Sequence, residues 1–184
     1  MYNKKKAIVL FGSPNENGYT ATALNKLIES LKDQYDFSII NSYKLNIHAC
    51  IDCKLCSKEH KCTFNDFKDI DTLIKNSELI VVASPVYNLS FPAPLKAIFD
   101  RMQIYFNSKT ILKVNPIEKP KSIILILSYG TNDHNTVEFI LKQLNPIMLL
   151  LNSRLIRKII IKNTDLNPII EDTILYQNDN NFIN

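Results

Sequence analysis

Apolar runs rich in strand-forming residues alternate with helical periodicity along this chain. The apolar runs predict strands at 6–11, 37–43, 78–84, 121–128 and 154–162. Apolar residues that recur every three or four positions predict helices at 20–34, 67–76, 92–106 and about 134–144. Pro146 is expected to interrupt the last helix or to begin a new turn. Strands that alternate with helices in this way form a parallel sheet covered on both faces, so we predict a doubly wound α/β fold with five parallel strands.

Composition places the chain among ordinary globular proteins. It has 184 residues, of which 46% are hydrophobic and 22% are charged, so we expect one domain spanning 1–184. The net charge is +4, but the Lys and Arg residues are scattered, which argues against a nucleic-acid partner. No apolar run approaches the length of a membrane span, and the N-terminus does not resemble a signal peptide. We therefore expect a cytoplasmic protein, in a reducing compartment that disfavours structural disulfides.

The segment that follows the fifth predicted strand is short for this fold class. It holds a brief apolar stretch and then an Asn-rich tail, whose composition predicts disorder over about 176–184. We therefore expect the helix that would close the sheet to be abbreviated.

All three glycines of the chain fall beside predicted strand ends. Gly12 and Gly18 lie in the loop after the first strand, and Gly130 lies just after the fourth. Open parallel sheets bind ligands beyond the carboxyl ends of their strands, where glycine lets the backbone turn tightly or approach a ligand closely. Their placement favours a ligand site at this edge over ordinary turns.

The first loop, GSPNENGYTATAL, suits a small terminal phosphate. It lacks the P-loop and dinucleotide-binding patterns, and it has no Lys or Arg between 12 and 20. It offers the polar side chains of Ser13, Asn15, Asn17 and Thr20 together with the free N–H groups of a helix start, which form a ready anion site. The alternative is that Asn17 and Thr20 simply cap the helix, and one residue could both cap the helix and bind the phosphate.

Three motifs together resemble a known family, over about residues 5–162. The first loop resembles the G-S-P-x-x-N-[GS]-x-T loop of the NAD(P)H-dependent FMN reductases and iron–sulfur flavoproteins, which have a flavodoxin-like fold. ASPVYNLSFPAPLKAIFDR, at 83–101, is similar to their second signature, S-P-V-Y followed by a helix with L-K-x-x-x-D-R. The cysteine run CIDCKLCSKEHKC resembles the C-x2-C-x2-C-x5-C run of the iron–sulfur flavoprotein branch and of some relatives described with flavin only.

The resemblance implies a set of FMN-binding residues. The FMN phosphate would be held by Ser13, Asn15, Asn17, Gly18, Thr20 and the Ala21 backbone. The ribityl chain and the isoalloxazine edge would lie along Pro85, Val86, Tyr87 and Asn88, and a third flavin loop would consist of Ser128, Tyr129 and Gly130. Asp100 and Arg101, which end the second signature, would only tie their helix to nearby backbone or to a second subunit.

The chemistry implied by the resemblance belongs to the cofactor. NAD(P)H would reduce bound FMN, which would pass electrons to flavin, quinone or a similar small acceptor. No side chain is expected to act as a catalytic nucleophile or base, and His48, His60 and His134 are interpreted as loop residues. One alternative is an electron carrier that connects protein partners through FMN and a [4Fe–4S] cluster. Another is a non-redox module that binds a different phosphate.

The four cysteines lie in a predicted loop at 48–66, and they leave four interpretations open. Three thiols at consecutive x2 intervals resemble the run that wraps a [4Fe–4S] cluster, in which case the metal ligands would be Cys50, Cys53, Cys56 and Cys62. Structural zinc sites usually separate two ligand pairs by a longer spacer. The thiols could instead pack the loop as small apolar groups, or form a redox-active disulfide.

The sequence departs from the family pattern at two places, and one predicted helix has more apolar residues than its contact with the sheet requires. Asn15 and Glu16 stand where relatives carry Arg or Lys, so the resemblance does not settle whether NADH or NADPH is used. His60 stands where relatives have glycine, and it is expected to crowd the loop or to be exposed, with a hydrogen-bond donor to a cysteine ligand as the alternative. The apolar 104–106 segment adds more surface to the helix at 92–106 than one sheet contact needs. Related reductases commonly form dimers or tetramers, so a homodimer or homotetramer is expected.

Overall fold

Five parallel strands form the centre of the protein. A computed structural model describes residues 4–133 and 135–175. The parallel strands are β1 (Lys5–Phe11), β2 (Tyr35–Asn41), β3 (Leu79–Pro85), β4 (Lys121–Ser128) and β5 (Ser153–Lys162). Their order is β2-β1-β3-β4-β5, the flavodoxin-like order in which the strand sequence reverses between β1 and β3. The doubly wound α/β prediction is confirmed.

A sixth strand changes the predicted strand count. β6 (Ile169–Ile174) pairs antiparallel with the outer side of β5. Arg157 on β5 holds Asp172 on β6 through two hydrogen bonds of 2.8 Å and 2.6 Å. The chain therefore follows β5 with a strand, where the sequence led us to expect a shortened helix. The tail at 176–184 lies outside the described residues.

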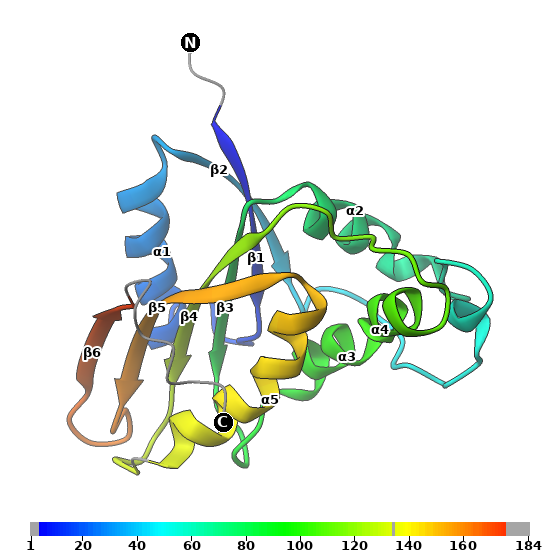
Figure 1. Ribbon diagram of the computed structural model, residues 1–184. Coiled ribbons are helices and arrows are strands. Elements are labelled where there is room, and N and C mark those ends of the chain that lie inside the picture. Colours follow the sequence, from blue (N-terminus) through cyan, green and yellow to red (C-terminus); the bar gives the residue numbers. More distant parts are fainter. Residues whose placement is uncertain (1–3, 134, 176–184) are drawn as a thin grey trace.

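Helices cover both faces of the sheet (Figure 1). α1 (Tyr19–Leu31) lies on one face, where Leu24 and Leu27 pack against Val9 of β1. The other face is covered by α2 (Lys68–Asn76), α3 (Ala93–Arg101), α4 (Gln103–Thr110) and α5 (Asn135–Leu150). Neighbouring residues of β1 point to opposite faces, and both sets are buried, which explains why this strand reads as a continuous apolar run.

The helix predicted at 92–106 is two helices. The chain bends at Met102, which ends α3 and precedes α4. Ile104 and Tyr105 are buried in the core after this bend, whereas Phe106 is exposed. The expectation that the 104–106 segment forms extra surface for a partner is therefore wrong for its first two residues, because the bend turns them inward.

The last helix continues through its proline. α5 contains Pro146 and ends at Leu150, beyond the expected end near 144. Pro146 removes one backbone donor from the helix, but the buried side chains of Ile140, Leu141 and Leu144 anchor the turns before it. Within the described ranges, no helix is long and apolar enough to cross a membrane.

Candidate functional site

The first loop leaves β1 in close contact with its neighbours. The Gly12 N–H donates to the Ala83 carbonyl oxygen on β3 at 2.8 Å. A Cβ at Gly12 would lie 2.6 Å from Leu95 Cδ2 and 2.9 Å from Ser84 Oγ. Glycine is therefore needed here because the loop crosses the sheet edge against β3 and α3.

Side chains of the loop shape its backbone and leave the helix start open. Ser13 Oγ accepts from the Asn15 N–H at 3.2 Å, and Asn15 Oδ1 accepts from the Asn17 N–H at 2.9 Å. Gly18 is the residue that precedes α1, and no side chain caps the helix there. The interpretation of Asn17 and Thr20 as capping residues is therefore wrong, and the first N–H groups of α1 keep their capacity to bind an anion.

Buried hydroxyls join the first predicted flavin loop to the third. Thr20 Oγ1 and Ser128 Oγ lie 2.6 Å apart, and both residues are buried. The Ser128 carbonyl oxygen in turn accepts from the Val86 N–H of the second loop at 2.8 Å. The structure thus brings all three loops together at the carboxyl edge of the sheet.

The second loop is a tight turn that exposes an aromatic ring. Tyr87 and Ser90 exchange two backbone hydrogen bonds of 3.0 Å, and the residues between them, Asn88 and Leu89, have φ values of 51° and 57°. These positive angles are those of a type I′ turn. Tyr87 is 46% exposed. Its ring is therefore available to a planar ligand at this edge.

The third loop contributes backbone more than side chains. Tyr129 is buried and belongs to the core, and burial raises the pKa of its hydroxyl. Its carbonyl oxygen accepts from the Thr164 N–H at 3.1 Å, so the connection between β5 and β6 packs against this loop. A Cβ on Gly130 would overlap the carboxylate of Asp165. The Asp165 side chain of the β5–β6 connection therefore occupies the space beside Gly130.

Three residues at the end of β2 join this edge, and sequence reasoning missed them. Lys44 pairs with Glu16 at 2.6 Å and thereby lowers the pKa of that carboxyl, so the first loop carries no uncompensated negative charge. Ser42 is fully buried, and its Oγ has no hydrogen-bond partner in the described part of the chain. Burial, and secondarily the nearby Tyr87, raises the pKa of the half-exposed Tyr43. These residues lie near the first loop because β2 pairs with β1, and the sequence alone does not give that pairing.

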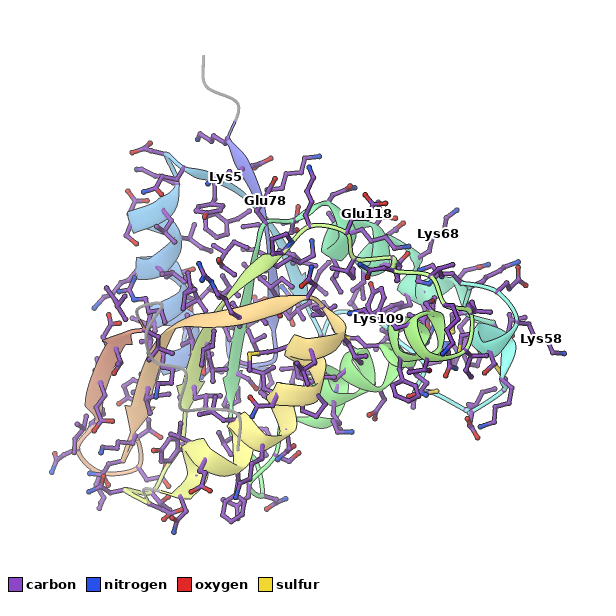
Figure 2. All side chains as sticks on the ribbon, viewed as in Figure 1. Lys5, Lys58, Lys68, Glu78, Lys109 and Glu118 are labelled. Carbon is purple, nitrogen blue, oxygen red and sulfur yellow. The ribbon has the colours of Figure 1, made fainter. Side chains whose placement is uncertain are left out.

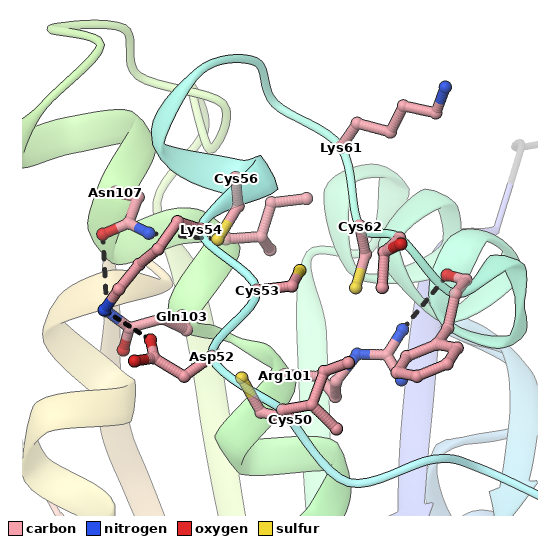
Figure 3. Close-up of a pocket in the computed structure, with 14 residues that line it drawn as sticks. Cys50, Asp52, Cys53, Lys54, Cys56, Lys61, Cys62, Arg101, Gln103 and Asn107 are labelled. Carbon is pink, nitrogen blue, oxygen red and sulfur yellow. Dashed lines mark hydrogen bonds and ion pairs between the residues drawn. The ribbon is translucent and has the colours of Figure 1, made fainter.

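A second site lies in the loop between β2 and α2, beside α4. Cys50, Cys53, Cys56 and Cys62 all line one open hollow (Figure 3). All four thiols are free. Among the described residues, no group of three or more His, Cys, Asp or Glu side chains is already arranged as metal ligands.

Cys56 is the most constrained of these thiols. It lies in a short 3-10 turn (Leu55–Ser57), and Asn107 Nδ2 on α4 donates to its sulfur at 3.0 Å. Burial raises the pKa of the Cys56 thiol, and the neighbouring Cys50 and Cys53 raise it further, while the Asn107 hydrogen bond opposes the shift. Hydrogen bonds to sulfur are a known means of tuning iron–sulfur centres.

Comparison with known proteins identifies the family. The sequence model of the family described as NADPH-dependent FMN reductase matches residues 5–161. This chain belongs to that family. An iron–sulfur flavoprotein from Archaeoglobus fulgidus is 28% identical over 108 residues, which cover 58% of this chain and 49% of the relative. The chain thus spans about half the length of the curated relatives that it matches.

Solved structures support the fold of this FMN reductase family member. An NAD(P)H:quinone oxidoreductase from Methanothermobacter marburgensis has a TM-score of 0.71 at 14% identity, covering 88% of this chain and 85% of its own. An FMN-dependent NADH-azoreductase from Bacillus anthracis, solved in complex with FMN, has a TM-score of 0.62 at 17% identity and covers 90% of both chains. At such identities the likeness establishes the flavodoxin-like fold.

Two histidines of this FMN reductase family member have defined partners around the cysteine loop. His60 Nδ1 lies 2.6 Å from Ser108 Oγ, and its Nε2 lies 2.7 Å from Lys75 Nζ. Burial, followed by the positive charge of Lys75, lowers the pKa of His60. His60 is therefore part of a half-buried polar network, and the expectation that it is simply exposed or crowds the loop is wrong. His48 pairs with Asp66, and His134 lies outside the described residues.

Proposed function

We propose that this protein is an FMN-dependent NAD(P)H oxidoreductase that passes electrons to flavin, quinone or a similar small acceptor. The observation that carries the proposal is the carboxyl edge of the sheet, where an uncapped helix start meets the buried hydroxyls of Thr20 and Ser128. Such a site offers neutral donors to a phosphate. Family membership over residues 5–161 makes FMN the ligand that this edge fits best.

Each of the three loops would contact a different part of FMN. The phosphate would lie against the first loop, where Ser13, Asn15, Asn17, Gly18, Thr20 and the Ala21 backbone form the start of α1. The second loop, Pro85, Val86, Tyr87 and Asn88, would follow the ribityl chain and the ring edge. The backbone of the third loop, Ser128, Tyr129 and Gly130, would close the other side, because the Tyr129 side chain is buried in the core.

Bound FMN would supply the redox chemistry by accepting a hydride from NAD(P)H and releasing electrons to the acceptor. The protein's own residues would position the ring. The exposed ring of Tyr87 offers an aromatic surface for stacking. The unpartnered Ser42 hydroxyl, buried near the first loop, is a spare donor for a ligand at this edge.

For the cysteine hollow we propose a [4Fe–4S] cluster held by Cys50, Cys53, Cys56 and Cys62. Thiolates are the ligands that such clusters use, and all four line the same hollow. α3 follows the second flavin loop closely and ends at Arg101, which also lines the hollow. Its nine residues span about 13 Å. This short helix connects the two sites, which favours a carrier role as the second candidate function.

Steady-state assays separate these functions. The FMN-loaded protein should oxidise NADH or NADPH in the presence of free flavin, quinone or azo acceptors. If it is reduced only through a protein donor, the carrier alternative is correct. Anaerobic reconstitution should yield about four iron atoms per chain if the cluster is present. Less than one iron per chain would eliminate the cluster and leave the flavin assignment standing.

The assembly implied by the family resemblance is also a proposal. A homodimer or homotetramer would give light-scattering masses of two or four chains at micromolar concentration. A monomer would remove it.

A further inference from the structure

A buried arginine joins the two ends of the cysteine loop. The side chain of Arg101, at the end of α3, is 1% exposed. Its Nη1 donates to the His48 carbonyl oxygen at 2.8 Å, and its Nη2 donates to the Phe64 carbonyl oxygen at 3.1 Å. His48 precedes all four cysteines in the sequence and Phe64 follows them, so one guanidinium holds both ends of the loop.

Four further contacts stabilise this arrangement. Asp66 Oδ1 pairs with Arg101 Nη2 at 2.8 Å, and Asp66 Oδ2 accepts from the His48 N–H at 2.8 Å. The His48 and Phe64 rings stack with their centroids 4.4 Å apart and their planes 9° from parallel. The Arg101 guanidinium carbon lies 5.3 Å from the centroid of the Phe64 ring. We call His48, Phe64, Asp66 and Arg101 the neck of the cysteine loop.

The neck also carries an unused donor at the wall of the hollow. Arg101 Nε is buried and has no hydrogen-bond partner in the described part of the chain. Arg101 lines the hollow together with the four cysteines, and Figure 3 shows its side chain beside Cys50 and Cys62. A buried N–H without a partner is costly, so native proteins usually provide an acceptor for it. The unmet donor points to an acceptor atom that a bound group would bring.

We propose that Arg101 is a positioning residue for the cysteine site. It holds the ends of the loop together so that four thiols face one hollow, and its Nε–H donates to a negatively charged sulfur of the group bound there. The first role depends only on the contacts of the neck. The second rests on the proposed cluster, whose sulfurs are the acceptors available.

The test compares three full-length variants. Arg101→Lys keeps the positive charge but loses the forked geometry and Nε. Phe64→Leu weakens the ring contacts of the neck and leaves every backbone acceptor in place, so it serves if Arg101→Lys does not fold. Lys96→Gln is the matched control, because it removes a cation from the same helix whose partner is the exposed Asp100.

The first readout is the reaction rate of the four thiols with Ellman's reagent in metal-free protein. Opening the neck should make the two partly buried thiols of Arg101→Lys, Cys56 and Cys62, react about 5- to 30-fold faster than in wild type, whereas the exposed Cys50 and Cys53 should change little. Phe64→Leu should shift in the same direction and Lys96→Gln should match wild type. Unchanged rates in both neck variants would overturn the positioning role, whether or not the protein takes up iron.

The second readout is iron content and midpoint potential after anaerobic reconstitution. Arg101→Lys should take up less iron than wild type, and the fraction that is loaded should have a more negative potential, because a donor to the cluster sulfur is lost. An unchanged potential in loaded Arg101→Lys would overturn the donor role. A wild-type protein that takes up no iron would overturn both the cluster and the donor role, while the thiol rates would still decide the role of the neck.

Discussion

Thr20 and Ser128 lie 108 positions apart in the sequence, yet their buried hydroxyl oxygens are 2.6 Å apart. The contact fixes the start of α1 against the end of β4, and the Ser128 carbonyl extends it to Val86. Three loops that together would surround FMN are therefore positioned relative to each other by hydrogen bonds before any ligand arrives.

Removing the Thr20 hydroxyl should weaken FMN binding. Thr20→Val keeps the shape of the side chain but leaves Ser128 without its partner. We expect the dissociation constant for FMN to rise about tenfold, the effect of losing one hydrogen bond of about 1.4 kcal/mol. Quenching of FMN fluorescence on titration measures it. Thr22→Val, the same change at an exposed site on α1, should leave the constant unchanged; equal losses in both variants would contradict the assignment.

The two glycines at strand ends should respond differently to alanine. A methyl group at Gly12 would press against Leu95 in the core, and we expect Gly12→Ala to lower the free energy of unfolding by about 1–3 kcal/mol. A methyl group at Gly130 would meet only the end of the exposed Asp165 side chain, which can turn away, so Gly130→Ala should cost less than about 1 kcal/mol. Urea denaturation measures both. A larger loss for Gly130→Ala would show that the contact between the loops is rigid.

The four thiols should differ in reactivity in metal-free protein. Cys50 and Cys53 are exposed, whereas burial raises the pKa of the Cys56 thiol and reduces its thiolate fraction at neutral pH. Brief treatment with iodoacetamide should therefore modify Cys50 and Cys53 before Cys56, as peptide mass spectrometry would show. Modification of Cys56 first would mean that the Asn107 hydrogen bond outweighs burial.

Because of the charged Asp66 in the neck, the free energy of unfolding should decrease as the pH falls in the acidic range. Burial alone would raise the pKa of Asp66, but hydrogen bonds from the His48 N–H and ring and from Arg101 outweigh it, and the net pKa is lowered. A carboxyl with a lowered pKa stabilises the folded state above its ordinary pKa, and this contribution is lost as the pH falls through the folded-state value.

Asp66→Asn should therefore be less stable than wild type at neutral pH, by about 1–3 kcal/mol. The difference should begin to shrink below about pH 4, where Asp66 of the unfolded chain takes up a proton, and it should be smallest once the pH has fallen below the lowered pKa of Asp66 in the folded protein. Thermal unfolding across the pH range measures it. A difference that stays constant down to the acid limit would show that the Asp66 charge does not hold the neck.

Sequence patterns predicted the parallel sheet well, because buried strands leave continuous apolar runs. They missed β6, whose residues are all exposed and which is held by backbone pairing and the contact between Arg157 and Asp172. They also missed the bend at Met102, because buried positions such as Leu95, Met102 and Tyr105 keep a helical spacing across it.

Sequence motifs also predicted part of the candidate site, but they did not predict the contacts between distant segments. Thr20 and Ser128 could each be proposed from the family resemblance, but their contact follows only from the order of β1, β3 and β4. Arg101 was visible as part of a signature, whereas its role in the neck depends on two backbone carbonyls that no side-chain pattern records. His60 was misjudged because its partners, Ser108 and Lys75, lie on two different helices.

The most direct test of the central claim is an anaerobic titration of the purified protein with FMN, followed by NADH or NADPH. We predict that the chain binds one FMN and that at least one of the two nicotinamides bleaches the visible absorption of the bound flavin. A chain that takes up no FMN when the flavin is in excess, or whose bound flavin stays oxidised with both nicotinamides, would contradict the account.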